Sequence, residues 1–250
     1  MAASTAALRG ITKQYKDFTL GPVDMTVPAG SIVGLIGENG AGKTTLLKIL
    51  CGVNRADDGT VDLLGGSPAD AATRAKIGVV FEDAFFYGTF TAAQVARSLA
   101  GMYGARWNAD SFSAYLRRFG LDAGKKLKEY SRGMRLKLSL AAALAHDPEL
   151  LVLDEATAGL DPVVRGELLD LFLEFIQDER HSIVMSSHIT ADLEQIADSI
   201  AYLHNGQLLF QENKDDLLQE YGVLQLLPEA VCDAARLDDI MRFYSGRDAQ

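Results

Sequence analysis

Uninterrupted apolar runs are the clearest feature of the hydrophobic pattern along this chain. SIVGLI (31–36) and LLVLD (150–154) are almost wholly apolar, which is typical of strands buried on both faces of a parallel sheet. VDMTV (23–27) alternates apolar and polar residues and therefore predicts a half-buried strand. Similar patterns predict further strands at TVDLLGG (60–66), KIGVVFED (76–83) and HSIVMSS (181–187).

Helical periodicity follows several of these strands. KTTLLKIL (43–50) predicts a helix, and Gly52 can adopt the left-handed conformation that ends it. Asp161 and Pro162 are a cap and a first-turn residue for an amphipathic helix through about Asp178. The segment ITADLEQIAD (189–198) predicts a helix with its apolar side chains on one face, at Ile189, Leu193 and Ile196.

A block of helices interrupts the strands between about residues 89 and 146. Its first helix begins at TAAQVARSLAGMY, with Thr91 as the N-cap, and ADSFSAYLRRFG ends on Gly120. Later, Asn205-Gly206 between AYLH and QLLFQ predicts a β-hairpin. This order of elements predicts an α/β core with an inserted helical lobe. Residues 223–250 carry no motif, and PEAVCDAARLDDIMRFY is interpreted as a terminal helix that packs on the core.

Composition narrows the class of protein. The 250 residues suit one large domain or two closely packed lobes, and the net charge of −10 disfavours a general nucleic-acid surface. The two cysteines, Cys51 and Cys232, are too few and too far apart for a zinc site or a disulfide framework. The N-terminus lacks a secretory pattern, and no apolar run reaches the roughly 18 residues of a membrane helix. We therefore expect a cytosolic location.

The segment GENGAGKTT (37–45) fits the phosphate-binding pattern G-x-x-x-x-G-K-[ST]. A predicted strand precedes it and a predicted helix follows it, which is the context that this loop requires. The glycines let backbone N–H groups face a polyphosphate, Lys43 can reach the β- and γ-phosphates, and Thr44 offers a hydroxyl to Mg²⁺. The alternative, a glycine-rich turn that matches by chance, does not explain the agreement of motif and context.

Two acids and a histidine follow buried strands. Asp154 ends LLVLD and can help to hold Mg²⁺, while Glu155 can accept a proton from water or orient it. Taken alone, they would be better explained as solvated acids at an ordinary strand end, but the nearby phosphate-binding loop favours the metal and water roles. His188 follows the strand IVMSS, where an imidazole N–H could donate to a γ-phosphate, although a lone histidine at such a place is often structural.

The segment YSRGM (130–134) stands before the apolar helical run LKLSLAAALAH, and it completes a resemblance. With the phosphate loop and the Asp-Glu pair, it resembles the nucleotide-binding domain of ATP-binding cassette (ABC) transporters over about residues 8–221. YSRGM occupies the place of that family's LSGGQ signature. It is similar to the SRGM forms of bacterial ABC-2-type exporter ATPases. AGLDP (158–162) and SSH (186–188) resemble further family motifs in the same order.

This resemblance implies both a fold and a set of binding residues. The implied fold is the P-loop NTPase fold of ABC ATPases, with a mainly parallel core sheet, an antiparallel β subdomain and an inserted helical subdomain. The nucleotide-binding domain would span 1–222, and 223–250 would be an extension of unknown role. The residues implied for binding ATP are Tyr15, Gly37, Asn39, Gly40, Ala41, Gly42, Lys43, Thr44 and Thr45, joined by Ser131, Gly133 and Asp161 from the opposite subunit.

The chemistry implied is ATP hydrolysis with Mg²⁺. Glu155, His188 and Lys43 would be catalytic, and Thr44, Glu82 and Asp154 would hold the metal. Glu82 stands where the family has glutamine, and Ala156 where proline is common. We expect activity to persist with an altered metal dependence or coupling, because a glutamate can also coordinate Mg²⁺ but adds charge near the phosphates.

The resemblance also implies partners. They are a second nucleotide-binding subunit, identical or similar, and a separately encoded integral membrane permease, with this chain at the cytoplasmic face of a bacterial membrane. The process would be export of a peptide, drug or lipid, and DAFFYGTFT (83–91) is the candidate docking surface. The alternatives are a soluble ABC ATPase that acts as a regulatory or mechanical module without a permease, and a P-loop small-molecule kinase. The ordered motifs disfavour the kinase.

Overall fold

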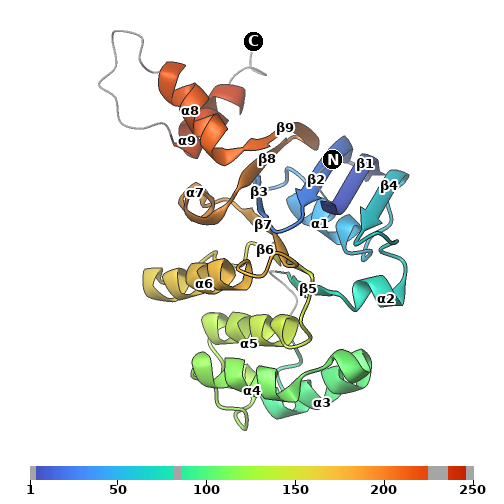
Figure 1. Ribbon diagram of the computed structural model, residues 1–250, viewed down its shortest axis with the longest axis vertical. Helices are drawn as coiled ribbons and strands as arrows, with labels where there is room; N and C mark the ends of the chain where they lie inside the picture. Colours follow the sequence, from blue (N-terminus) through green and yellow to red (C-terminus); the bar gives the residue numbers. More distant parts are fainter. Residues whose placement is uncertain (1–3, 82–85, 225–235, 246–250) are drawn as a thin grey trace.

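A six-stranded sheet forms the centre of the molecule (Figure 1). The computed structural model describes residues 4–81, 86–224 and 236–245. The strand order is β5-β6-β7-β3-β8-β9, and neighbouring strands are parallel except for the antiparallel pair β8 and β9. The strands are β3 (Ile32–Ile36), β5 (Ile77–Val80), β6 (Leu150–Asp154), β7 (Ser182–Ser187), β8 (Ser199–His204) and β9 (Gln207–Asn213).

Both faces of this sheet are buried, which explains the uninterrupted apolar runs. In β3, Ile32 and Ile36 belong to one hydrophobic cluster and Val33 and Leu35 to another, because successive side chains point to opposite faces. The first cluster lies under α5 (Arg132–Leu144), α6 (Pro162–Phe175) and α7 (Thr190–Ile196). The second lies under α1 (Lys43–Leu50) and a smaller sheet. The predicted α/β class with a mainly parallel sheet is confirmed.

The smaller sheet is antiparallel, with the order β2-β1-β4. Its strands are β1 (Ser4–Gln14), β2 (Thr19–Pro28) and β4 (Asp58–Leu63). The hydrophobic pattern alone does not predict β1. Gly10 has a φ of 59°, and the pairing with β2 shifts register between Leu8 and Ile11. The irregularity breaks the apolar–polar alternation that would identify a strand.

The inserted helical lobe lies at one end of the molecule (Figure 1), and it has its own hydrophobic cluster. Thr91 forms the predicted N-cap, as part of a capping box with Gln94, and Gly120 follows the second helix with a φ of 64°. The lobe contains α3 (Ala92–Tyr103), η1 (Gly104–Arg106), α4 (Ala109–Arg118), η2 (Leu127–Glu129) and α5, and the short α2 (Ala71–Arg74) precedes β5.

The C-terminal part contains α6, α7, α8 (Lys214–Leu224) and α9 (Leu237–Ser245). Helix α6 ends at Phe175, earlier than the predicted Asp178, because the following residues form a separate turn. In that turn the Arg180 backbone N–H and guanidinium both bond to the Asp178 carboxylate. Helix α9 packs on the core, as predicted for a terminal helix, although residues 225–235, including Cys232, lie outside the described residues.

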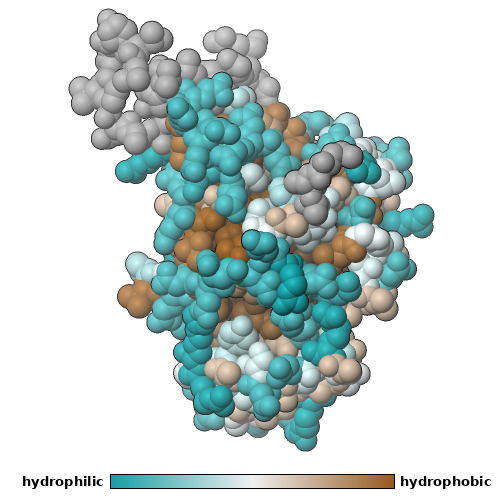
Figure 2. Space-filling view, in the orientation of Figure 1, coloured by the Kyte–Doolittle hydropathy of each residue, from teal (hydrophilic) through white to brown (hydrophobic). Residues whose placement is uncertain are grey.

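Hydrophilic residues cover much of the face shown in Figure 2, and hydrophobic residues reach this surface near α7 and between the two lobes. Within the described ranges, no helix is both long and apolar enough to cross a bilayer.

Candidate nucleotide-binding and hydrolysis site

The loop 37–42 connects β3 to α1 and is held closely against the core. A Cβ atom at Gly37 would lie 2.3 Å from the Leu203 carbonyl oxygen, so only glycine fits there. Gly42, with a φ of 107°, is the N-cap of α1. The predicted hairpin contributes to this arrangement, because Gly206 N–H donates to the Ala41 carbonyl at 3.1 Å. Asn39 and Gly40 are exposed at the outer side of the loop, where a ligand can reach them.

Lys43 is buried, and its ammonium group is surrounded by oxygen atoms. Nζ donates to the carbonyls of Gly37 at 2.7 Å and Glu38 at 3.3 Å, and it lies 3.3 Å from Oε1 of Glu155. Lys43 therefore connects the phosphate loop with the acid that follows β6. The hydrophobic pattern could not show this pair, because the two residues are far apart in the chain.

Thr44 and Asp154 form the part of the site that can hold a metal ion. Thr44 Oγ1 donates to Asp154 Oδ2 at 2.8 Å, and Ser186 Oγ donates to Oδ1 at 2.7 Å. Both donors are neutral hydroxyls, and the Asp154 residue is only 2% exposed. A divalent cation beside Thr44 would compensate the buried carboxylate charge, and hydroxyl and carboxylate oxygens are the ligands that Mg²⁺ prefers.

The metal would also need oxygen ligands from a bound phosphate or from water. Among residues 4–81, 86–224 and 236–245, no group of three or more His, Cys, Asp or Glu side chains is arranged to hold a metal ion. In the usual mode of Mg²⁺ binding, substrate phosphates and waters complete the shell. Glu82, the third predicted ligand, lies outside the described residues.

Glu155 is turned back toward the phosphate loop by its backbone. Its φ of 52° is in the left-handed region, which is uncommon for a residue other than glycine. Its N–H donates to the carbonyl and the hydroxyl oxygens of Ser186, at 3.2 and 3.1 Å. The side chain then has Oε1 near Lys43 and Oε2 near His188, so one carboxylate contacts both other predicted catalytic residues.

The contact between His188 and Glu155 shows which ring nitrogen of His188 carries a hydrogen. Nδ1 of His188 lies 2.6 Å from Oε2 of Glu155, and the His188 backbone N–H donates to the same oxygen at 3.3 Å. Because the carboxylate accepts, Nδ1 carries the hydrogen. In the neutral ring Nε2 is then an acceptor. A donation from Nε2 to a phosphate therefore requires the doubly protonated ring.

All of these groups lie at the carboxyl ends of adjacent parallel strands. Gly37 follows β3, Asp154 ends β6 and His188 follows β7. The strand register fixes their relative positions along the strand direction, because Asp154 pairs with Ser186 and Ile36 pairs with Ser187. This is the edge at which open α/β sheets bind ligands.

Other predicted residues lie near this centre or apart from it. Tyr15 is 42% exposed and stacks on Phe18 with the ring centroids 6.4 Å apart, and Phe18 in turn lies against Gly42. Ser131 caps α5 by accepting from Met134 N–H at 3.2 Å. Asp161 caps α6 by accepting from Val164 N–H at 3.0 Å. Figure 1 shows α5 in the helical lobe, away from α1.

The signature segment and the loop that precedes α6 are neighbours. A Cβ atom at Gly133 would lie 3.5 Å from a methyl group of Leu160. Ser131, Gly133 and the 158–161 loop therefore form a second group of predicted residues. Within the described residues, no hydrogen bond or ion pair joins this group to Lys43. The proposed contact of this group with nucleotide would need another subunit.

Two residues have structural roles that the sequence motifs did not predict. Ser186, part of the SSH motif, holds both Asp154 and the backbone of Glu155, and its polar side chain in an otherwise apolar strand was the available signal. Tyr130 replaces the leucine of the signature, and its buried hydroxyl donates to the Asp122 carbonyl at 2.7 Å. The tyrosine thus ties the signature segment to the lobe, which the aligned motif could not reveal.

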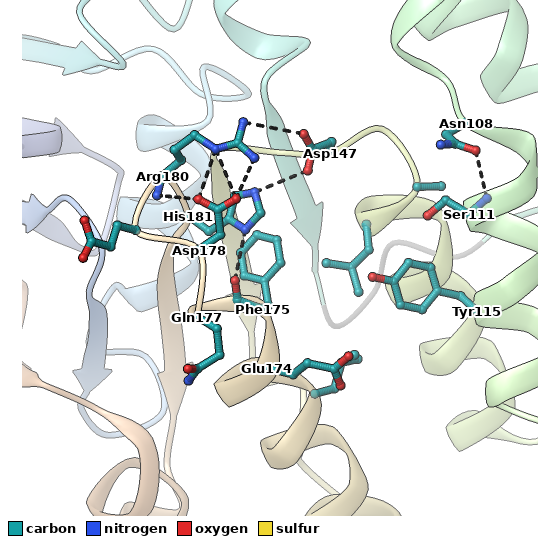
Figure 3. Close-up of a pocket in the computed structure, with 14 residues that line it drawn as sticks. Asn108, Ser111, Tyr115, Asp147, Glu174, Phe175, Gln177, Asp178, Arg180 and His181 are labelled. Carbon is teal, nitrogen blue, oxygen red and sulfur yellow. Dashed lines mark hydrogen bonds and ion pairs between the residues drawn. The ribbon is translucent and has the colours of Figure 1, made fainter.

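A cleft of about 1070 Å³ lies elsewhere, between α4 and the loop that leads from α6 to β7 (Figure 3). The His181 ring stacks on Phe175 at 4.2 Å, and its Nδ1 lies 3.0 Å from the Phe175 carbonyl oxygen. Its Nε2 lies 3.3 Å from the Asp147 carboxylate. Asp147 precedes β6 and His181 precedes β7, so this cleft is at the opposite end of the strands from Lys43 and is not part of the candidate site.

Comparison with known proteins agrees with the fold and the motifs. The family model described as ABC transporter matches residues 20–158. The chain is 38% identical over 206 residues to an uncharacterised ABC transporter ATP-binding protein, sll0415, of Synechocystis, covering 80% of this chain and 58% of the relative. It is 36% identical over 212 residues to the bacitracin transport ATP-binding protein BcrA of Enterococcus faecalis, covering 83% and 68%.

A solved structure is similar over nearly the whole chain. It is described as an ATP-binding subunit of an ABC transporter, and it aligns with a TM-score of 0.84 at 27% identity, covering 97% of this chain and 100% of the other. The chain spans only 58% of the length of the Synechocystis relative, which is therefore the longer protein.

Proposed function

Because the chain belongs to the ABC transporter family, we propose that it is an ATP-binding and ATP-hydrolysing subunit that drives export through a separately encoded membrane permease. One observation carries this proposal. Lys43, the Thr44–Asp154 pair and the Glu155–His188 pair converge at one edge of the sheet, beside a loop built to receive phosphate. These are the groups that phosphoryl transfer to water requires.

In the proposed site the loop and the first turn of α1 hold the triphosphate. We expect the N–H groups of Gly40, Gly42 and Thr45 and the Lys43 ammonium to hold the phosphates, because a helix N-terminus favours anions. The exposed ring of Tyr15 offers a face on which adenine can stack. When bound, Mg²⁺ would neutralise phosphate charge, and Thr44 and Asp154 would be its protein ligands.

Glu155 is the proposed general base. In the chain alone its Oε1 is shared with Lys43. Phosphate oxygens offer Lys43 another anionic partner, and Oε1 is then free to accept a proton from a water molecule. His188 holds the other oxygen, so the carboxylate keeps its direction while the proton is transferred.

The proposed active unit is a dimer. Within the described residues, no hydrogen bond or ion pair joins Ser131, Gly133 or Asp161 to Lys43. Ser131 and the N–H groups at the start of α5 can nevertheless bind phosphate. We assign them to the nucleotide of a second subunit, which is a copy of this chain or a similar one. ATP between the two subunits would hold them together, and hydrolysis would release them.

The proposed membrane partner docks beside the start of the helical lobe. Tyr87 is 77% exposed and Met102 78%, so both side chains are open to a partner. A cavity of about 290 Å³ lies nearby, and it is lined by Val79, Phe86, Leu99, Tyr103, Ser139, Ala142 and Ala143. The buried Ser139 hydroxyl has no hydrogen-bond partner there within the described residues. A largely apolar segment with one polar group would fit. Residues 83–85 of the predicted docking segment lie outside the described residues.

Export of a peptide, drug or lipid is the proposed process, at the cytoplasmic face of a bacterial membrane. The name of the Enterococcus relative states bacitracin transport, and it supports this choice of cargo class.

The test begins with phosphate release by the purified protein with ATP and Mg²⁺. Light scattering of the Glu155→Gln variant with and without ATP then measures pairing. Co-purification of a membrane permease with the ATP-loaded variant, and its loss when Tyr87 and Met102 become Ser, would support the transport assignment. ATP turnover and membrane attachment without any permease would contradict it.

A further inference from the structure

The last described helix, α9, is packed into the core. Its residues Leu237 and Ile240 are each only 1% exposed and belong to the hydrophobic cluster beneath α6 and α7. Tyr244 packs against Phe210 of β9 with ring centroids 5.0 Å apart. Figure 1 shows α9 close to α7, although a long stretch of chain separates the two helices. The helix therefore contributes to the structure around α7.

Two polar contacts join the first turn of α9 to α7. Thr190 Oγ1 donates to Asp238 Oδ1 at 2.9 Å, and the Leu237 N–H donates to Glu194 Oε1 at 2.7 Å. Thr190 is the first residue of α7 and is 5% exposed. The preceding N-cap residue is the apolar Ile189, so its side chain cannot accept a hydrogen bond from the helix start. The start of α7 is thus held from outside, by α9.

Thr190 lies two residues after His188, and the segment between them has few free torsions. Ser187 Oγ accepts from the Ile189 N–H at 2.9 Å, and the His188 N–H donates to Glu155. Each residue has only two soft backbone dihedrals. Fixing the Thr190 side chain therefore restricts where the His188 ring can lie relative to Glu155.

We propose that Asp238 is a positioning residue for His188. By holding Thr190, helix α9 sets the direction of the imidazole that contacts Glu155. The proposal rests on the proposed ATP hydrolysis for its functional consequence, but the position of His188 can be measured without hydrolysis. A role for Asp238 in packing alone would change stability and leave the His188 contact unaltered.

The experiment compares Asp238→Ala with two controls. Asp239→Ala removes an exposed acid of the same turn. Within the described residues the Thr190 hydroxyl bonds to Asp238 and not to Asp239. Asp238→Asn keeps a carbonyl oxygen that can accept from Thr190. The readouts are kcat and KM for ATP, and the imidazole ¹⁵N signals of His188 in the nucleotide-free protein, assigned with His188→Gln.

We expect Asp238→Ala to lower kcat about tenfold, because small misplacements of catalytic groups are costly, while KM stays within about twofold. The His188 signals should shift in the same variant. Asp239→Ala and Asp238→Asn should match the parent protein in both readouts. Thr190→Val should reproduce Asp238→Ala, and the double variant should be no worse than either single variant, because both remove one contact.

Unchanged His188 signals and unchanged kcat in folded Asp238→Ala would overturn the proposal. An equal effect of Asp239→Ala would do the same, since it would point to charge rather than contact. If Asp238→Ala does not fold, Thr190→Val decides the question, because it keeps a buried side chain of similar shape. A parent protein that binds but does not hydrolyse ATP would refute the proposed function, and the His188 signals would still decide the positioning role.

Discussion

Nδ1 of His188 lies 2.6 Å from Oε2 of Glu155, so the two residues assigned to hydrolysis are hydrogen-bonded within a single chain. The second oxygen of the same carboxylate lies 3.3 Å from Lys43. The acid is thus held from both sides, by a residue that follows β7 and by one that begins α1. Its reactivity should depend on both neighbours.

Replacing Glu155 by Gln should separate ATP binding from turnover. The amide has a similar shape but cannot take a proton from water, and general-base catalysis typically contributes about 10²- to 10⁴-fold. We expect phosphate release to fall by that order while ATP binding persists and an ATP-dependent dimer accumulates. Binding of a fluorescent nucleotide measures the affinity for ATP, and light scattering measures the fraction of dimer. Turnover within about threefold of the parent would refute Glu155 as the base.

His188 should matter mainly through the hydrogen that it donates to Glu155. His188→Ala removes this donor and should lower kcat about a hundredfold. His188→Asn keeps an N–H near the position of Nδ1 and should retain clearly more activity than the alanine variant. If the two variants are equally impaired, the second ring nitrogen is the important one, and a phosphate contact through Nε2 explains the role of His188 better.

Thr44 should influence both stability and metal dependence. Thr44→Val leaves the buried Asp154 Oδ2 without its donor, and an unsatisfied buried acceptor costs about 1–3 kcal/mol of unfolding free energy. The same change removes a proposed Mg²⁺ ligand, so half-maximal ATPase activity should require about tenfold more Mg²⁺. Thr44→Ser keeps the hydroxyl and is the matched control. Equal Mg²⁺ requirements in both variants would place the metal elsewhere.

Tyr130→Phe should destabilise the helical lobe without removing activity. The variant loses the hydrogen bond to the Asp122 carbonyl, which is worth about 1 kcal/mol in urea unfolding. Tyr130→Leu, which restores the common residue of the signature, should cost more, because the side chain is 3% exposed and the change leaves a cavity. Stability equal to the parent in both variants would contradict this assignment.

Cys51 should be unreactive in the folded protein. Burial, together with the nearby Asp154 carboxylate, raises the pKa of the Cys51 thiol to about 12. In a Cys232→Ser background, a thiol reagent at pH 8 should modify Cys51 only after unfolding, because the thiolate is the reactive form. Rapid modification of Cys51 in the native protein would contradict the prediction and would show that the core around Cys51 opens.

The Cys51 thiol also makes the stability of the folded protein depend on pH. The folded-state pKa lies above the ordinary value of 9.0, so above that pH the unfolded chain releases a proton that the folded chain keeps. The contribution of Cys51 is therefore fully present below pH 9.0 and is lost as the pH rises toward about 12. Stability of the parent should fall more steeply over this range than that of Cys51→Ala, measured by urea unfolding.

The sequence predicts well those features that depend on short stretches of chain. Gly52, the Thr91 cap and the Asn205-Gly206 hairpin all adopt the expected conformations, because each depends on the backbone preferences of a few neighbouring residues. The ABC resemblance and the α/β fold are confirmed as well. The motifs that support the resemblance are also short, and they occur along the chain in the same order as in the family.

Long-range contacts are what the sequence could not show. The Lys43–Glu155 pair joins residues from different strand ends, and the contact of Thr190 in α7 with Asp238 in α9 depends on where a distant helix packs. The roles of Ser131, Gly133 and Asp161 stay predictions, since they concern a second subunit. The domain boundaries and the metal role of Glu82 also stay predictions.

The polarity of the sheet has a consequence for insertions into this chain. Lys43, Asp154 and His188 lie at or beyond the carboxyl ends of β3, β6 and β7. The turn at 29–31 and the loop 176–181, in contrast, precede the amino ends of β3 and β7. Lengthening these two connections leaves the strand register, and hence the spacing of Gly37, Asp154 and His188, unchanged. A reporter peptide or an affinity tag inserted there should be tolerated, whereas one extra residue between Ser186 and His188 should abolish turnover.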